Sequence, residues 1–332
     1  MAVAAKPLSE LEALQRQFAL RKPASLYRDA WHRLVRNRGS VAGMIVVVLF
    51  ALVGIFAPLI APHPPLQINQ GNTYRVPVWI SLPNDPARTG DPRFTLGTDT
   101  LGRDVLSRVI FGARTSMAVG FIPMVLILLI GTTIGMIAGY AGGWIDNLLM
   151  RMTDIVYAFP DLLFFIIMIT ALRDTWIGKL LDGFVLLFVS LALVSWVTVA
   201  RLVRGQVLSI KEKEYIEAAR SIGASPARIM FNHIFPNSLA PLIVSAAFLV
   251  PASIVTEATL GYLGIGVRPT VDPRAPFPTS WGNLLNDGRV AINVQPWLLV
   301  APALCVGIIM LAFTFIGDGL RDALDPMMRG TA

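Results

Sequence analysis

Six long apolar segments are the feature of this sequence that most restricts its fold. They lie at residues 40–61, 115–138, 152–172, 183–200, 238–260 and 297–316. A helix rises about 1.5 Å per residue, so about 20 apolar residues cross the hydrocarbon core of a bilayer. The chain is 55% hydrophobic and only 15% charged, whereas soluble domains carry about 25% charged residues. We therefore predict an all-α, polytopic membrane protein with six transmembrane helices.

Lysine and arginine are unevenly distributed among the connecting segments, and this bias indicates the orientation. Residues 1–39 carry eight of them against three acids, residues 201–236 carry six, and residues 62–104 carry four with four acids. We expect residues 1–39, 201–236 and 317–332 to be cytoplasmic, and the loop 62–114 to be extracytoplasmic. The net charge of +7 follows from this topology, so nucleic-acid binding has no separate support.

The hinge segment, which we define as residues 214–237, is charged and lies between two apolar segments. Tyr215, Ala218, Ala219 and Ile222 recur at i, i+3, i+4 and i+7, which predicts one narrow apolar stripe on a short helix. The two alanines would keep the stripe flat, so that a partner could approach the backbone closely. Neighbouring charged residues suit the polar rim of an interface. The simpler alternative is an amphipathic helix on lipid headgroups.

Three signals divide the hinge segment into two helices. Gly223 is expected to end the first helix in the left-handed conformation. Ser225 and Pro226 favour a second helix, as its N-cap and its first helical residue. Pro236 is expected to mark the end of this second helix and the return into the membrane.

The run Glu217-Ala218-Ala219, with Gly223 and Pro236, resembles the Glu-Ala-Ala loop of ATP-binding-cassette importer permeases. In that family a short helix of this loop docks in a cleft on the ATPase subunit. The resemblance implies the type I fold of these permeases, with a permease core over residues 115–316 and a coupling loop over residues 201–236. It also implies that the ATPase-coupling residues are Tyr215, Glu217, Ala218, Ala219, Ile222, Gly223 and Pro236.

Other motifs resemble the C-type permease subunits of dipeptide, oligopeptide and nickel importers, from about Trp31 to Arg329. They are the run from Leu96 to Asp104, an aspartate followed by Ala-Phe-Pro, a glutamate before a glycine run, and a loop that faces the substrate-binding protein. The residues that these motifs suggest for gating or partner contact are Asp99, Gly102, Arg103, Asp104, Asp154, Pro160, Glu257 and Trp281.

Simpler interpretations of the same residues stay open. Asp99 and Asp104 could form an Asx-turn and a helix N-cap, and a calcium site there would lack ligands. Asp154 and Glu257 could cap or bridge helices, which we favour over direct contact with a solute. The loop that contains Trp281 could equally fold as a plain lid.

Small residues and prolines within the apolar segments predict close packing and bending. Gly131, Gly135 and Gly139 are spaced by four residues, which favours contact with a neighbouring helix. Four prolines fall inside different predicted spans, where each is expected to bend its helix. They are Pro123, Pro160, Pro251 and Pro302. The single cysteine, Cys305, excludes an internal disulfide and is expected to pack in the last span.

The inventory of reactive residues disfavours an enzyme. His32, His63 and His233 lie in separate segments, so a shared triad or metal site is not expected. The sequence also lacks the glycine-rich lysine motif that cradles ATP phosphates. An ATP-independent channel or secondary carrier is the alternative class. A channel would need a filter or charged ring, and a carrier would need ionisable groups along its midplane, and neither pattern is evident.

The resemblance implies a transmembrane permease subunit of an ATP-driven, binding-protein-dependent importer that works by alternating access. The implied partners are a second, B-type permease subunit, two ATPase subunits that bind ATP and Mg²⁺, an extracytoplasmic substrate-binding protein and membrane lipid. No cofactor and no metal site are expected in this chain, which would be a multi-pass protein of the cell (inner) membrane. Di- or oligopeptides are the implied solutes, with nickel, opines, glutathione and sugars as alternatives.

Overall fold

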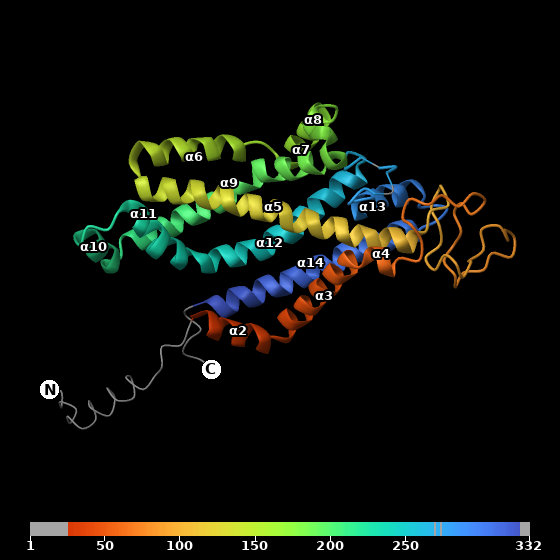
Figure 1. Ribbon diagram of the computed structural model, residues 1–332, viewed down its shortest axis with the longest axis horizontal. Helices are drawn as coiled ribbons and strands as arrows, with labels where there is room; N and C mark the ends of the chain where they lie inside the picture. Colours follow the sequence, from red (N-terminus) through yellow and green to blue (C-terminus); the bar gives the residue numbers. More distant parts are fainter. Residues whose placement is uncertain (1–25, 269, 273, 326–332) are drawn as a thin grey trace, which may run out of the picture.

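The computed structural model describes residues 26–268, 270–272 and 274–325. Over these ranges the regular structure is helical; there is one isolated β-bridge, between Thr98 and Asp104, and no β-strand. The long helices lie side by side, with the loop before α5 at one end and α10 and α11 at the other (Figure 1). We call these the cap end and the hinge end. The elements are α2 (Leu26–Arg36), α3 (Arg38–Ile55), α4 (Ala57–Ile60), α5 (Val105–Ala141), α6 (Gly143–Tyr157), α7 (Asp161–Leu172), α8 (Trp176–Lys179), η1 (Leu180–Gly183), α9 (Phe184–Lys211), α10 (Glu214–Ser221), α11 (Pro226–Ile229), η2 (Met230–Ile234), α12 (Phe235–Tyr262), α13 (Trp281–Val290) and α14 (Trp297–Leu324).

Five helical stretches are long and apolar enough to cross a membrane. They are Arg38–Ile55, Val105–Ala141, Trp176–Lys211, Pro226–Tyr262 and Trp297–Leu324. Each contains all or most of one predicted span, and four of them also extend into segments predicted as loops. α5, for example, begins at Val105, inside the stretch 62–114 that was expected to be a loop. Parts of the predicted segments 1–39 and 317–332 lie outside the described residues.

The third predicted span, residues 152–172, is not a single helix. α6 ends at Tyr157 and α7 begins at Asp161, and the two helices are bent by 81° at the break between them. Pro160 explains the break, because it has no N–H to continue the helix and it disfavours the helical conformation of Phe159 before it. The other three prolines expected to bend spans lie within the continuous helices α5, α12 and α14.

The most extensive helix contact joins α5 to α9, and glycines allow the two backbones to approach each other. A Cβ atom on Gly131 would lie 2.6 Å from Val199 Cβ, and one on Gly135 would lie 2.5 Å from the carbonyl oxygen of Ala200. Gly139 approaches Val207 in the same way, at 2.7 Å. The predicted packing role of the three glycines is therefore confirmed.

A second layer, α2, α3 and α14, completes the bundle. The Ser40 hydroxyl at the start of α3 donates a hydrogen bond to the Phe315 carbonyl of α14 at 3.0 Å. Leu34 of α2 and Ala323 of α14 belong to one buried cluster. The two described ends of the chain therefore lie together, on the side of the bundle where α10 lies (Figure 1).

Substitution of Gly135 by valine tests the glycine contact. We expect it to force α5 away from α9 and to lower the free energy of unfolding by about 1–3 kcal/mol, the usual effect of overpacking. The measurement is the thermal unfolding midpoint of the detergent-solubilised protein. Gly307→Val is the matched control, because a Cβ at Gly307 meets no atom within 4 Å. Equal midpoints for the two variants would contradict the proposed tight contact.

Candidate functional site

The hinge segment forms two short helices joined by a turn, as the sequence predicts. Gly223 follows α10 with φ +82°, the left-handed conformation expected of a glycine that ends a helix. Its N–H donates to the Arg220 carbonyl at 2.9 Å. The Ser225 hydroxyl accepts a hydrogen bond from the Arg228 N–H at 3.3 Å, and Pro226 is the first residue of α11. Local signals therefore determine the turn.

α10 has two apolar faces rather than one stripe. Ile216 and Ala219 are buried in a cluster shared with α5, α9 and α12. Tyr215 and Ala218 are exposed, and Ile222 is 86% exposed. The prediction that Ala218 and Ala219 form one flat contact surface is thus corrected. A partner can reach Ala218, whereas Ala219 holds α10 against its own chain.

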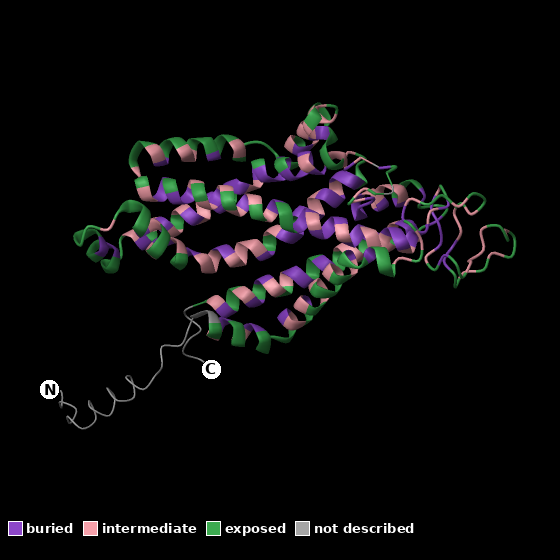
Figure 2. Cartoon of the chain, in the orientation of Figure 1, coloured by how far each residue is buried: buried purple, intermediate pink, exposed green. Residues whose placement is uncertain are grey.

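Charged side chains border the exposed face of α10. Lys213, Glu214 and Glu217 are all exposed, and most of this helix is coloured as exposed in Figure 2. Arg220 extends toward α5, with its guanidinium carbon 5.9 Å from the ring centroid of Tyr140. The exposed apolar residues therefore lie within a rim of both signs of charge, which is the composition of many protein interfaces.

Two polar contacts hold the neighbouring helix ends at the hinge end. Arg204 of α9 forms a bidentate ion pair with Asp146 of α6, at 2.5 and 2.6 Å. Lys211 Nζ donates to the Gly139 carbonyl of α5 at 3.2 Å. α5, α6 and α9 are thus tied together directly beside α10.

Pro236 does not end the second helix of the hinge segment, contrary to the prediction. The path from Pro226 to Tyr262 is one continuous helical stretch, in which Met230–Ile234 is a π-helical turn and Pro236 lies in the first turn of α12. Pro236 has no N–H for the carbonyl four residues earlier, and such a gap favours a wider turn. Asn237 Nδ2 donates to the His233 carbonyl at 2.6 Å within this region.

At the cap end, Asp99 organises a buried ion-pair cluster. Its carboxylate accepts hydrogen bonds from the Leu101 and Arg103 N–H groups, at 2.8 and 3.0 Å, which makes the Asx-turn of the simpler interpretation. Arg103 Nε and Arg108 Nη1 lie 2.7 and 2.5 Å from Asp99 Oδ2, and Arg108 Nη1 also lies 2.9 Å from Asp287 Oδ2. Gly102 has φ +74° in this turn. Asp99 is 0% exposed, so a direct contact with a partner is excluded for it.

Asp104 is the N-cap of α5, which confirms the simpler interpretation of this residue. Its carboxylate accepts from the Ser107 N–H at 2.9 Å and from the Ser107 hydroxyl at 2.5 Å. His63 Nδ1 lies 3.6 Å from the same carboxylate. Elsewhere in the cap, hydrogen bonds from Arg93 lower the pKa of Asp91 to about 2. The cap is therefore a folded unit with its own network of charges.

Trp281 and Glu257 are both 0% exposed. Trp281 Nε1 donates to the Val109 carbonyl at 3.0 Å, and its ring packs edge-on against Phe50 with centroids 5.4 Å apart. Trp281 therefore joins α13 to α5 and cannot touch a binding protein, which corrects that prediction. A Cβ on Gly282 would lie 2.7 Å from Glu257 Oε1, so the glutamate packs against the start of α13. This geometry agrees with a bridging role for Glu257.

Asp154 and Pro160 lie at the break between α6 and α7. Arg201 Nη2 of α9 is 2.8 Å from Asp154 Oδ1, so the aspartate bridges two helices. The Arg201 guanidinium carbon also lies 4.4 Å from the ring centroid of Tyr157. All of these groups are at least partly exposed on the surface of the isolated chain.

Sequence reasoning did not identify the contribution of Arg108 and Asp287 to the cap cluster. They are separated by 179 residues, so no local pattern connects them. Nor did it pair Asp154 with Arg201, although an aspartate and an arginine within apolar segments are individually unusual.

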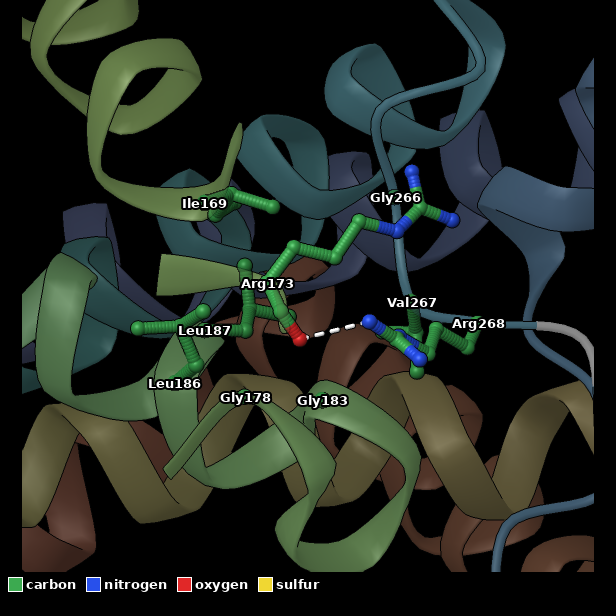
Figure 3. Close-up of a pocket in the computed structure, with 9 residues that line it drawn as sticks. All are labelled: Ile169, Arg173, Gly178, Gly183, Leu186, Leu187, Gly266, Val267 and Arg268. Atoms are coloured by element: carbon green, nitrogen blue, oxygen red, sulfur yellow. Dashed lines mark hydrogen bonds between the residues drawn. The ribbon is translucent and has the colours of Figure 1, made fainter. Parts of the chain in front are cut away.

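Two hollows of the chain are either small or apolar. The cavity in Figure 3 is about 20 Å³, room for roughly one water molecule, and beside it Arg268 Nη2 donates to the Arg173 carbonyl at 2.6 Å. A groove of about 580 Å³ between α5 and α12 is lined almost entirely by apolar side chains. The first is too small for a peptide, and the second offers few polar partners. Within the described ranges there is also no group of three potential metal ligands.

Comparison with known proteins identifies the fold. The transmembrane subunit fold of the methionine ABC transporter MetNI, solved in inward-facing conformations, aligns with a TM-score of 0.52 and 20% identity, over 66% of this chain and 97% of that chain. The chain therefore has the ABC importer permease fold.

Closer relatives are found by sequence. The dipeptide transport system permease protein of Alkalihalophilus pseudofirmus is 38% identical over 92% of this chain and 91% of its own length. The oligopeptide transport system permease protein of Escherichia coli is 40% identical over 92% of each chain. The N-terminal TM domain of oligopeptide transport permease C matches residues 25–77. Because the remaining match, over residues 131–330, covers more than half of the sequence, the chain belongs to the family of binding-protein-dependent transport system inner membrane components.

Proposed function

We propose that the chain is the transmembrane permease subunit of an ATP-driven, binding-protein-dependent importer of di- or oligopeptides. The family and the functions of its relatives support the class of transporter and the class of solute. The observation that carries the coupling mechanism is the exposed apolar face of α10. Tyr215, Ala218 and Ile222 form it, and all three are exposed, although the Tyr215 ring also lies beside His233 of η2, with ring centroids 6.4 Å apart.

The inward face of α10 would transmit movement from an ATPase to the membrane helices. Ile216 and Ala219 share one buried cluster with Val207 of α9, Ile234 of η2 and Leu242 of α12. Packed side chains of this kind move together, because a close-packed interior is not easily deformed. A push on the exposed face of α10 would therefore reach α9 and α12 at once.

The proposed partner subunits fit this arrangement of the two ends of the bundle. The hinge end would be cytoplasmic, as the lysine and arginine bias favours, and α10 would sit in a cleft of one of two ATPase subunits. ATP and Mg²⁺ would bind to those subunits, so this chain would hydrolyse nothing itself. A second permease subunit would complete the pathway, and an extracytoplasmic binding protein would deliver the peptide at the cap end.

In the proposed cycle, binding of ATP would close the ATPase subunits and displace α10. The cluster beneath α10 would carry this movement into α9 and α12, and the pathway would open toward the binding protein. Hydrolysis would reverse the movement and open the pathway toward the cytoplasm. Only the difference in contacts between the two states can drive such a shift.

A glutamate at Ala218 tests the docking face. We expect Ala218→Glu to remove the ATPase from the purified complex and to reduce ATP-driven peptide uptake at least about tenfold, because an unpaired charge would enter an apolar contact. The measurements are co-purification of the ATPase and uptake of radiolabelled trialanine into membrane vesicles. Ala219→Glu is unsuitable, since it would bury a carboxylate inside this chain.

Ala87→Glu is the matched control for this test. Ala87 is also exposed, but it lies in the cap, far along the chain from the hinge segment. It should retain the ATPase in the purified complex, which separates loss of docking from a general effect of an added carboxylate. Normal uptake by a well-expressed Ala218→Glu variant would contradict the proposed docking face.

The importer is distinguished from a channel or secondary carrier by its energy source. We expect a pull-down of the tagged protein from native membranes to recover a P-loop ATPase and a second permease, identified by mass spectrometry. Uptake by vesicles should require ATP and should stop with vanadate. A homo-oligomer without an ATPase, or uptake that a proton gradient alone supports, would favour the alternative class.

A further inference from the structure

The break between α6 and α7 leaves several backbone groups without partners in this chain. The Ala158 N–H donates to the Asp154 carbonyl at 3.0 Å, and the Phe164 N–H donates to the Pro160 carbonyl at 3.1 Å. Between these bonds, the carbonyls of residues 157–159 and the N–H groups of residues 161–163 bond to nothing else in the described part of the chain. All residues from 157 to 163 are exposed.

The packing of α6 and α7 against α9 places this break at membrane depth. Val156, just before the break, packs on a cluster that contains Trp196 of α9. Phe165, just after it, belongs to a cluster that contains Leu191 of α9. The break therefore lies beside the uncharged stretch of α9 from Phe184 to Ala200, toward its Ala200 end, because Asp154 pairs with Arg201. Figure 1 shows the break part of the way along the bundle, not at an end.

Lipid cannot cover such a surface. Hydrocarbon offers no hydrogen bonds, and irregular backbone at membrane depth occurs only where protein buries it or where it lines water. Charged groups add to the requirement. Asp154 and Arg201 form a partly exposed ion pair, and Asp161 is exposed with no ion-pair or hydrogen-bond partner for its side chain in the described ranges. An ionised Asp161 at this depth would cost about 2.5–3.5 kcal/mol or more against lipid.

Water satisfies all of these groups more simply than a dry protein interface does. A covering subunit would need a partner for each free carbonyl, each free N–H and each carboxylate, and unmatched ones would be costly. We propose that the exposed break, residues 157–163, forms part of the wall of the water-filled path through which the solute crosses the membrane. This inference rests on the proposed importer function.

The chemistry of the break suits a peptide main chain. Free carbonyls and N–H groups can pair with the N–H and carbonyl groups of an extended peptide, as when a peptide pairs with an exposed strand edge. Phe159 and Leu162 offer exposed apolar surface beside them. Contacts of this kind do not depend on the side chains of the solute, which is what a carrier of peptides of varied sequence requires.

Cysteine accessibility in the complete transporter tests the proposal. Cys305 is the only cysteine, so Cys305→Ser provides a background without thiols. Phe159→Cys and the control Leu311→Cys are added singly, because Leu311 is similarly exposed, at 59%, but lies within continuous α14. The probe is a quaternary-ammonium methanethiosulfonate, which reacts with thiolates in water. Vesicles are assayed without nucleotide and with ATP and vanadate.

We expect Phe159→Cys to react at least about tenfold faster than Leu311→Cys in one of the two states, because only a hydrated thiol ionises readily. Trialanine should slow the reaction. Equal, slow rates in both states would overturn the proposal, as would a thiol that is unreactive but crosslinks to the second permease. Fast labelling without protection by trialanine would overturn the peptide contact.

Two further measurements keep the result interpretable. Ala158→Cys, a smaller change at an exposed position, replaces Phe159→Cys if that variant does not assemble with its partners. ATP-driven uptake is measured separately in the Cys305→Ser background. Absence of uptake both there and in the unsubstituted chain would count against the importer function, whereas labelling reports on hydration of the break alone.

Discussion

Hydrocarbon cannot hydrogen-bond to a peptide group, and most of this structure follows from that constraint. Five long helical stretches satisfy it internally. The contact between α5 and α9 adds tight packing, since Gly131, Gly135 and Gly139 allow two backbones to approach without polar side chains. The break between α6 and α7 violates the constraint within the single chain. A violation of this kind indicates that the chain is completed by water or by other subunits.

The hinge segment presents two different apolar faces on one short helix. Ile216 and Ala219 commit one face of α10 to the cluster with α5, α9 and α12, while Tyr215 and Ala218 leave the other face open. A helix with a single apolar stripe could either pack on its own chain or bind a partner. Two faces permit both at once, which is what transmission of a movement requires. The ion pair of Arg204 with Asp146 stiffens the same end of the bundle.

The sequence predicted what depends on local order and missed what depends on tertiary contact. Apolar segments of sufficient length, and the Gly223 and Ser225 signals, determine their structures within a few residues, so the membrane spans and the turn were foreseen. The burial of Ala219 depends on a cluster from three other helices, which heptad-like spacing alone cannot show. The Arg108 and Asp287 pair spans 179 residues. A bend at Pro160 was predicted, but the sequence did not show that the span divides there into two helices bent by 81°.

α9 connects the two functional features physically. Its end at Lys211 lies beside α10, and its Val207 packs in the cluster that supports that helix. Six residues before Val207 on the same helix, Arg201 forms an ion pair with Asp154, which lies in the last turn of α6 before the break. A helix of 28 residues is stiff over this distance. Because the ion pairs of Arg204 with Asp146 and of Arg201 with Asp154 both join α9 to α6, a displacement of α10 that moves α9 would carry α6 with it. Under the proposed coupling, these two ion pairs would link the movement of α10 to the break between α6 and α7.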